Sequence, residues 1–192
     1  MKLFLKGTRC STNKCAFTKR TTPPGQHGQL RVKPSNYGLQ LREKQKVKRM
    51  YGLLERQFRK YFHMAEKVKG VTGRQLLQYL ERRIDNVVFR MNFAVSRSQG
   101  RQVVRHNHVL INGKKVNIPS YLVKANDSIK IRGKDKFINK IRENIDSCKD
   151  RHEPAWIEID KQNLSGKINR LPEKEDIAVP IQEQLIVELY SK

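Results

Sequence analysis

Residues 96–116 have the pattern of a short basic helix followed directly by a β-hairpin. Ser96 is followed three residues later by Gln99, which is the spacing of a capping box and predicts that a helix begins here. Asn112 and Gly113 then form a pair that favours a two-residue turn between short strands. A helix joined so closely to a hairpin indicates one compact unit.

The basic side chains of this predicted helix gather on one side of it. At 100° per residue three arginines fall within one narrow stripe, while Val103, Val104 and Gly100 fall on the neighbouring face. The valines can pack inward and leave the arginines to face an anionic partner; these arginines are Arg97, Arg101 and Arg105. The competing interpretation is a solvated helix beside an ordinary hairpin.

The charge of the whole chain favours nucleic acid as the partner. Its 192 residues carry a formal net charge of +23, and such a surplus is destabilising through self-repulsion unless an anion neutralises it. Residues 1–60 hold 16 Lys and Arg against 2 Asp and Glu, whereas residues 161–192 hold 5 of each. The N-terminal third is therefore the electropositive end.

Composition disfavours several other classes of protein. No run of 18 apolar residues could span a bilayer, and the N-terminus lacks the apolar stretch of a signal peptide. We therefore expect a cytoplasmic protein with no membrane partner. Three cysteines are too few, and odd in number, for a disulfide framework.

The pattern of the chain predicts an α+β fold. Residues 1–37 are basic and rich in turn formers, which is typical of an extended arm. A first predicted helix begins at residue 39, and further helices are predicted over 54–68, 73–83 and 133–152. Thr72 and Gln75 form a predicted capping box, and Asp85 is predicted to cap a further short helix. Strands are predicted over 109–111, 128–132 and 156–160. The helix over 54–68 is expected to bury the side chains of Leu54, Phe58, Tyr61, Phe62, Ala65 and Val68. The apolar residues 185–190 are expected to dock on the chain itself.

Five stretches of the chain, taken in order, resemble the bacterial family of small-subunit ribosomal protein number four. They are residues 5–10, 23–28, 40–46, 83–88 and 183–192. Several such matches in the same order are far more specific than one short motif, and together they span the whole chain.

The resemblance implies a non-enzymatic constituent of the small ribosomal subunit that binds its ribosomal RNA directly and nucleates early assembly of the 5′ domain. It also implies a place at the messenger-RNA entrance, an effect on translational accuracy, and contacts with neighbouring small-subunit proteins. The expected parts are a basic arm over 1–37, a mainly helical domain over 38–82 that residues 161–192 complete, and an inserted helix–hairpin RNA-binding module with a small, mostly antiparallel sheet over 83–160.

The candidate RNA ligands are mostly cations, because Lys and Arg neutralise phosphates and the guanidinium can contact a phosphate through two N–H groups. The three arginines of the stripe come first, and residues in and after the hairpin come second: His106, His108, Lys114, Lys115 and Lys124. The helical domain adds Arg42, Lys46, Lys48, Arg49, Arg56 and Arg59. By the resemblance, Arg31 and Lys33 lie near the messenger entrance. For each lysine the alternative is a solvated side chain.

Cys10 and Cys15 supply half of a tetrahedral zinc site. In some relatives of the resembling family two further cysteines complete the site, in an arm that precedes the segment matching residues 2–4. Structural zinc is therefore expected only if such a pair precedes Met1: either the arm is absent in nature or Met1 is an internal methionine. His27 is the nearest other ligand type and is expected to contact RNA or backbone instead. No other cofactor is expected.

Two classes remain as alternatives. An RNA-modifying enzyme such as a pseudouridine synthase needs a separate catalytic domain, which neither residues 1–82 nor residues 146–192 provide. A free heat-shock or ribosome-rescue factor would also be small, basic and non-catalytic, but it would leave the small subunit in a high-salt wash.

Overall fold

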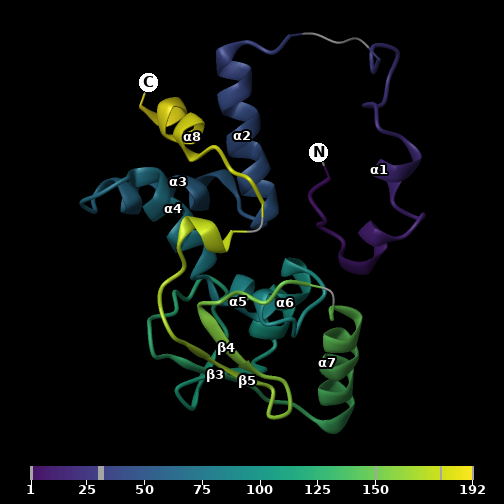
Figure 1. Ribbon diagram of the computed structural model, residues 1–192, viewed down its shortest axis with the longest axis vertical. Coiled ribbons are helices and arrows are strands. Elements are labelled where there is room, and N and C mark those ends of the chain that lie inside the picture. The colour runs from purple at the N-terminus through teal and green to yellow at the C-terminus, as the bar shows by residue number, and fades with distance from the viewer. Residues whose placement is uncertain (1, 30–32, 150, 178, 192) are drawn as a thin grey trace.

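The computed structural model describes residues 2–29, 33–149, 151–177 and 179–191. These residues build two hydrophobic cores (Figure 1), one inside a group of helices and one around a five-stranded sheet. We call the first the helical body (α2, α3, α4 and α8) and the second the module (α5, α6, α7 and the strands). The N-terminal segment, residues 2–29, runs beside both and contains η1 (Gly7–Ser11) and α1 (Ala16–Lys19).

The helical body joins the first helices of the chain to its last one. Its elements are α2 (Asn36–Met50), α3 (Glu55–Glu66), α4 (Thr72–Glu81), η2 (Lys174–Asp176) and α8 (Glu183–Tyr190). α8 packs on α2 and α4, where Ile186 is fully buried and the ring of Tyr190 stacks on Phe62 with centroids 4.4 Å apart. The prediction that the apolar C-terminal residues dock on the chain itself is confirmed.

Two details of the predicted helices are wrong. Leu54 is 73% exposed and Val68 is 39% exposed, because α3 runs only from Glu55 to Glu66 and both residues lie beyond its ends. Thr72 is already helical, and Val71 precedes it without a side-chain cap, so the predicted capping box does not form. Helix spacing identifies the buried face within a helix but not where that helix ends.

The module alternates short helices with an antiparallel sheet. Its elements are α5 (Ile84–Arg90), α6 (Arg97–Arg105), β1 (Val109–Ile111), β2 (Lys114–Val116), β3 (Ser128–Ile131), α7 (Asp135–Ser147), β4 (Ile157–Asp160) and β5 (Ser165–Ile168). The strand order is β2-β1-β3-β5-β4, and every neighbouring pair is antiparallel. Trp156 and Phe93 are fully buried at its core. Asp85 does not cap α5: Arg83 stands at that position, and Asp85 lies inside the first turn.

The helix–hairpin unit forms as its sequence predicts. The Ser96 hydroxyl accepts a hydrogen bond from the Gln99 amide at 3.2 Å, so α6 begins where expected. Asn112 and Gly113 have φ values of 49° and 78°, as a hairpin turn with two left-handed residues requires, and β1 pairs with β2 around them.

One predicted boundary is wrong. β5 pairs with both β3 and β4, and its Ile168 is buried in the core of the module. Residues 161–168 therefore belong with the module, and the chain returns to the helical body only afterwards. The predicted α+β class, with a mainly helical part and a small antiparallel sheet, is confirmed. No helix within the described ranges is long and apolar enough to cross a membrane.

Candidate nucleic-acid interface

Helix α6 is held unusually close to α5 by a glycine. A Cβ atom added at Gly100 would lie 2.5 Å from the backbone oxygen of Asp85, so a larger residue cannot occupy this contact without a shift. The helix penalty of Gly is offset here by close packing. This contact fixes the rotation of α6 and decides which of its side chains face solvent.

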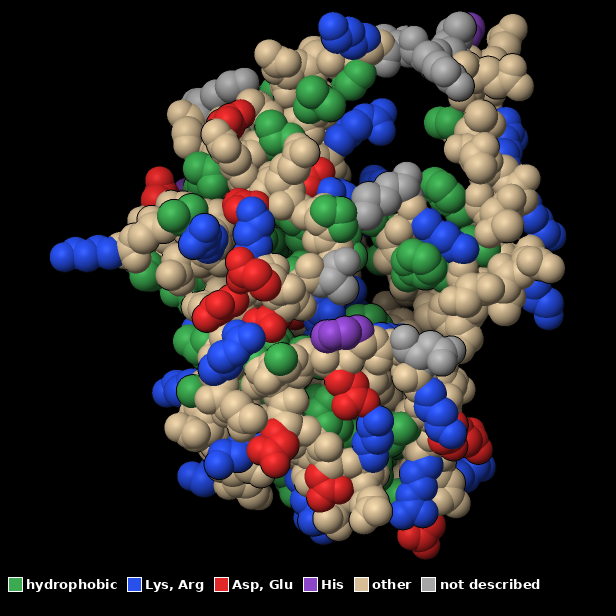
Figure 2. All heavy atoms as spheres, viewed as in Figure 1, with side chains coloured by type: hydrophobic (Ala, Val, Ile, Leu, Met, Phe, Trp, Pro, Cys, Tyr) green, Lys and Arg blue, Asp and Glu red, His purple; other side chains and the backbone are tan. Residues whose placement is uncertain are grey.

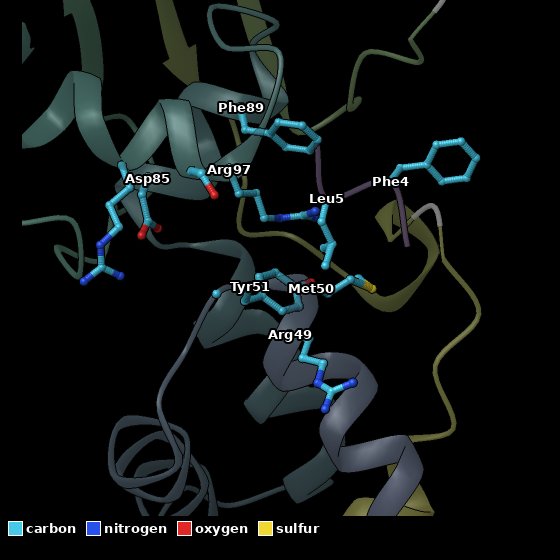
Figure 3. A pocket seen from close by; sticks show the side chains of 11 residues that line it. Phe4, Leu5, Arg49, Met50, Tyr51, Asp85, Phe89 and Arg97 are labelled. Carbon is cyan, nitrogen blue, oxygen red and sulfur yellow. The ribbon is translucent and has the colours of Figure 1, made fainter. Parts of the chain in front are cut away.

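That rotation turns Arg97 inward, which corrects the prediction that all three arginines of the stripe face a partner. The guanidinium of Arg97 lies between two rings, 4.9 Å from the centroid of Tyr51 and 4.5 Å from that of Phe89 (Figure 3). Its Nε donates to the side-chain oxygen of Asn86 at 2.7 Å. Tyr51 follows α2 of the helical body, whereas Phe89 and Asn86 lie on α5, so Arg97 joins the two bodies of the protein.

A buried carboxylate completes this junction. Glu81, at the end of α4, accepts hydrogen bonds from the Tyr51 hydroxyl at 2.5 Å and from Asn86 at 2.8 Å. Two nitrogens of Arg90 donate to the same carboxylate at 2.8 and 2.9 Å. Burial raises the pKa of Glu81, but the charges of Arg90 and Arg97 and the hydrogen bonds from Arg90 and Tyr51 together outweigh burial and hold the pKa below its ordinary value. Both bodies thus contribute to one hydrogen-bonded network where they meet.

The other two stripe residues and the second-choice residues other than His108 remain accessible to solvent. Arg105 is exposed and Arg101 half-buried, and no hydrogen bond or ion pair among the described residues engages Arg101. The second-choice residues His106, Lys114, Lys115 and Lys124 are exposed as well. We call Arg101, Arg105 and these four residues the module face.

His108 differs from the residues around it, because its ring is partly engaged inside the protein. Its Nδ1 lies 2.9 Å from the backbone oxygen of Arg132, and its ring stacks on Phe137 with centroids 3.8 Å apart. The ring therefore connects the start of β1 to α7, and only part of it remains available to a ligand.

The predicted cations of the helical body divide into two groups. The exposed group consists of four arginines: Arg42, Arg49, Arg56 and Arg59. Lys46 instead pairs with Glu43 at 2.6 Å and donates to the backbone oxygen of Pro180 at 3.0 Å, while Lys48 pairs with Glu55 at 3.0 Å. These two lysines stabilise the helical body, and the prediction that they are free to bind phosphate is corrected. Of the two entrance candidates, Lys33 is exposed and Arg31 lies outside the described residues.

The two thiols near the N-terminus do not make a zinc site by themselves. Cys10 and Cys15 are both buried, and the Cys10 sulfur accepts a hydrogen bond from the Lys6 amide at 3.3 Å. Over the described part of the chain, no group of three or more His, Cys, Asp or Glu side chains could hold a metal ion. Two thiols fall short of the four ligands of structural zinc, so the residues present do not fit it.

Sequence reasoning missed the residues that clamp Phe89. The guanidinium of Arg151 lies 4.3 Å from the Phe89 centroid and donates to the backbone oxygens of Ala94 at 3.2 Å and Val95 at 3.1 Å. With Arg97, it places two cations on one ring. The only signal for Arg151 is its charge, which it shares with forty other residues, so its internal role could not be found from spacing.

The arrangement defines a class: a nucleic-acid-binding protein in which a helix–hairpin module is fixed to a helical body and presents cations outward. Comparison with known proteins agrees. The family model described as the ribosomal protein S4/S9 N-terminal domain matches residues 1–81, and the S4 domain matches residues 82–129.

Similarity to curated proteins identifies the family more narrowly. The chain is 59% identical to small ribosomal subunit protein uS4 of Caldicellulosiruptor saccharolyticus, 58% identical to that of Thermodesulfovibrio yellowstonii and 57% identical to that of Desulforapulum autotrophicum. In each case the match covers 100% of this chain and 92% of the relative. The chain belongs to the uS4 family of small ribosomal subunit proteins, and the resemblance found in the sequence is confirmed.

Proposed function

We propose that this chain is a structural, non-catalytic constituent of the small ribosomal subunit and binds small-subunit ribosomal RNA directly. Its place of action is the cytoplasm, on the ribosome. The observation that carries the proposal is the module face, which consists of six accessible cationic or imidazole side chains on α6, the hairpin and the following loop. Gly100 and the Arg97 junction fix the orientation of α6. Family membership supports the same role.

The mechanism follows from rigidity and charge. Arg101 and Arg105 lie one turn apart on α6, and the hairpin adds Lys114 and Lys115, so cations from two elements meet one RNA surface. Folded RNA is recognised mainly through its shape, phosphates and 2′-hydroxyls, which requires a binding surface of fixed form. The junction supplies this, because it holds the arginines of the helical body and the module face in one orientation.

Finer parts of the function belong to the same proposal. The chain nucleates early assembly of the 5′ domain, since a rigid two-body protein can hold several RNA helices in register before other proteins arrive. Arg31 and Lys33 contact messenger RNA at its entrance and influence translational accuracy. Neutralising both residues tests this part: it fails if translation through structured messages is unchanged while assembly is normal.

The main test is a salt titration of binding to a 5′-domain fragment of small-subunit ribosomal RNA. The double variant Arg101→Gln and Arg105→Gln should bind more weakly and reduce the slope of log K against log salt by about two, one for each phosphate that is no longer neutralised. The matched control is Lys149→Gln with Lys161→Gln, which removes the same charge from lysines paired with Asp146 and Glu153.

An unchanged slope in the first variant, or an equal change in both, contradicts the assignment of the module face. Sedimentation separates the remaining alternative. A structural constituent stays with the small subunit through a high-salt wash, whereas a free factor is released.

A further inference from the structure

One carboxylate lies buried beside the cations of the module face. Asp127, between the loop that carries Lys124 and strand β3, is 7% exposed, and no Lys or Arg side chain pairs with it among the residues that the structure describes. Other acidic side chains differ. Figure 2 shows several Asp and Glu at the surface beside Lys or Arg, and Glu153 pairs with Lys161 at 2.5 Å. A buried carboxylate without a counterion depends on hydrogen bonds, so its donors indicate its role.

The two donors to Asp127 belong to separate parts of the module face. One oxygen accepts from the backbone amide of Lys124 at 2.8 Å, and the other accepts from the side-chain nitrogen of Asn112, in the hairpin turn, at 2.9 Å. The Asn112 side-chain oxygen accepts in turn from the backbone amide of Ser128 at 2.9 Å. We call these three bonds the turn clamp. The clamp joins the hairpin turn to the loop that precedes β3.

We propose that Asp127 is a positioning residue of the RNA-binding module, which holds the hairpin lysines and Lys124 at one fixed spacing through the turn clamp. The inference rests on the proposed function, and it adds an acidic residue to a face of cations and imidazoles. Asp127 does not itself contact RNA, because its side chain is buried and both oxygens are engaged.

The sign of the charge makes this role distinguishable from an electrostatic one. A carboxylate beside the module face repels phosphate, so electrostatics alone predicts that its neutralisation strengthens RNA binding. Positioning predicts the reverse, because the hairpin lysines and Lys124 fit one RNA surface only while the clamp holds them together.

The turn clamp needs a carboxylate at one side and an amide at the other. In Asp127→Asn, whichever way the two side-chain amides turn, two N–H donors face each other at one of the three bonds. The exchange variant, Asn112→Asp with Asp127→Asn, can make all three bonds again, with donor and acceptor reversed between the two side chains. Its net charge equals that of the parent.

The test measures binding of the full chain to the 5′-domain RNA fragment over a range of salt concentrations. Asp127→Asn should bind about tenfold more weakly at about 0.1 M salt and lower the salt slope by about one, which is the share of one phosphate contact, although its net positive charge rises.

The matched control is Asp160→Asn, in the turn between β4 and β5 and outside the module face. Asp160 also accepts two backbone amides, those of Gln162 and Asn163, at 3.0 Å, and the side-chain nitrogen of Asn163 at 2.6 Å. The same charge and the same kinds of bond are therefore changed. This control should bind RNA like the parent.

Two further variants separate the clamp from the charge. Asn112→Gly removes the clamp without changing the charge, and Gly tolerates the φ of 49° at this position. It should weaken binding about as much as Asp127→Asn, whereas the exchange variant should bind within about twofold of the parent. Urea unfolding of each variant gives the conditions in which only folded chains are compared. If Asp127→Asn does not fold, Asn112→Gly and the exchange variant make the same comparison.

A purely structural role would lower the urea midpoint of Asp127→Asn and leave RNA binding by the folded chain equal to that of Asp160→Asn; this result overturns the proposal. An exchange variant that binds no better than Asn112→Gly overturns it as well. Failure of the two inferences is distinguishable. If the parent chain does not bind the RNA fragment, the proposed function fails; if it binds and the clamp variants match the control, only the positioning role is refuted.

Discussion

The role of Arg97 gives the sharpest prediction, because its charge indicates an RNA ligand and its surroundings indicate a junction residue. Arg97→Met removes a guanidinium held between two rings, which contributes about 2 kcal/mol when desolvated, and leaves the Asn86 oxygen without its donor at about 1–3 kcal/mol. The Met side chain refills part of the space. We expect the free energy of unfolding to fall by about 3 kcal/mol, a large share of the roughly 5–15 kcal/mol of a folded domain.

Urea unfolding followed by circular dichroism measures this change. With a slope of about 2 kcal/mol per molar urea, the midpoint should fall by about 1.5 M. The matched control is Arg101→Met one turn later on α6, which should move the free energy of unfolding by no more than about 0.5 kcal/mol.

RNA binding must show the opposite pattern. At a temperature where both variants are folded, Arg101→Met should lower the salt slope by about one and Arg97→Met should leave it unchanged. If Arg97→Met keeps the urea midpoint and lowers the slope, Arg97 is a phosphate ligand and the junction argument is refuted.

Three further predictions concern stability. Glu55→Gln should lower the free energy of unfolding by about 1 kcal/mol at neutral pH, because hydrogen bonds from Lys44, Lys48 and Tyr190 outweigh partial burial and lower the pKa of Glu55 to about 2. Since the folded-state pKa is depressed, this contribution is present above about pH 4.5 and is lost as the pH falls toward 2. The unfolding curves of parent and variant should therefore converge in acid. Gly100→Ala should destabilise the protein by about 1–3 kcal/mol in thermal unfolding, although Ala favours a helix, because the new methyl meets a carbonyl of α5; a rise in melting temperature contradicts this. Glu81→Leu should cost about 3–5 kcal/mol by leaving the guanidinium of Arg90 buried without its partner. Adding Arg90→Met should restore part of this loss in urea unfolding, while the Tyr51 hydroxyl remains without its acceptor; no recovery in the double variant disproves the pairing.

Local chemistry made several elements predictable. Ser96 and Gln99 indicated the start of α6, and Asn112-Gly113 indicated the hairpin turn, because capping and left-handed turns depend on a few adjacent residues. The strand β5 is not predicted, because it depends on residues that are distant in sequence. Its residues include Ser165 and Gly166, which have little strand preference, and only pairing with β3 and β4 makes them a strand.

The candidate site divides in the same way. Helical spacing correctly placed Val103 and Val104 inside, but a stripe defined by angle could not separate Arg97 from Arg101. Their environments differ because Tyr51 contacts Arg97. Helical spacing cannot predict this contact, since Tyr51 is distant in sequence. Likewise, the charge of Lys48 did not reveal its ion pair with Glu55.

By itself, the sequence determined the family, the excess of positive charge, the α+β class and the helix–hairpin unit, since these depend on composition, order and neighbouring residues. Only the tertiary structure decided which cations face solvent and which hold the protein together. The distinction between Arg97 and Arg101 arises because residues far apart in the chain, from α4, α5 and the end of α2, meet at one buried junction, and Gly100 lets α6 approach closely enough to join it.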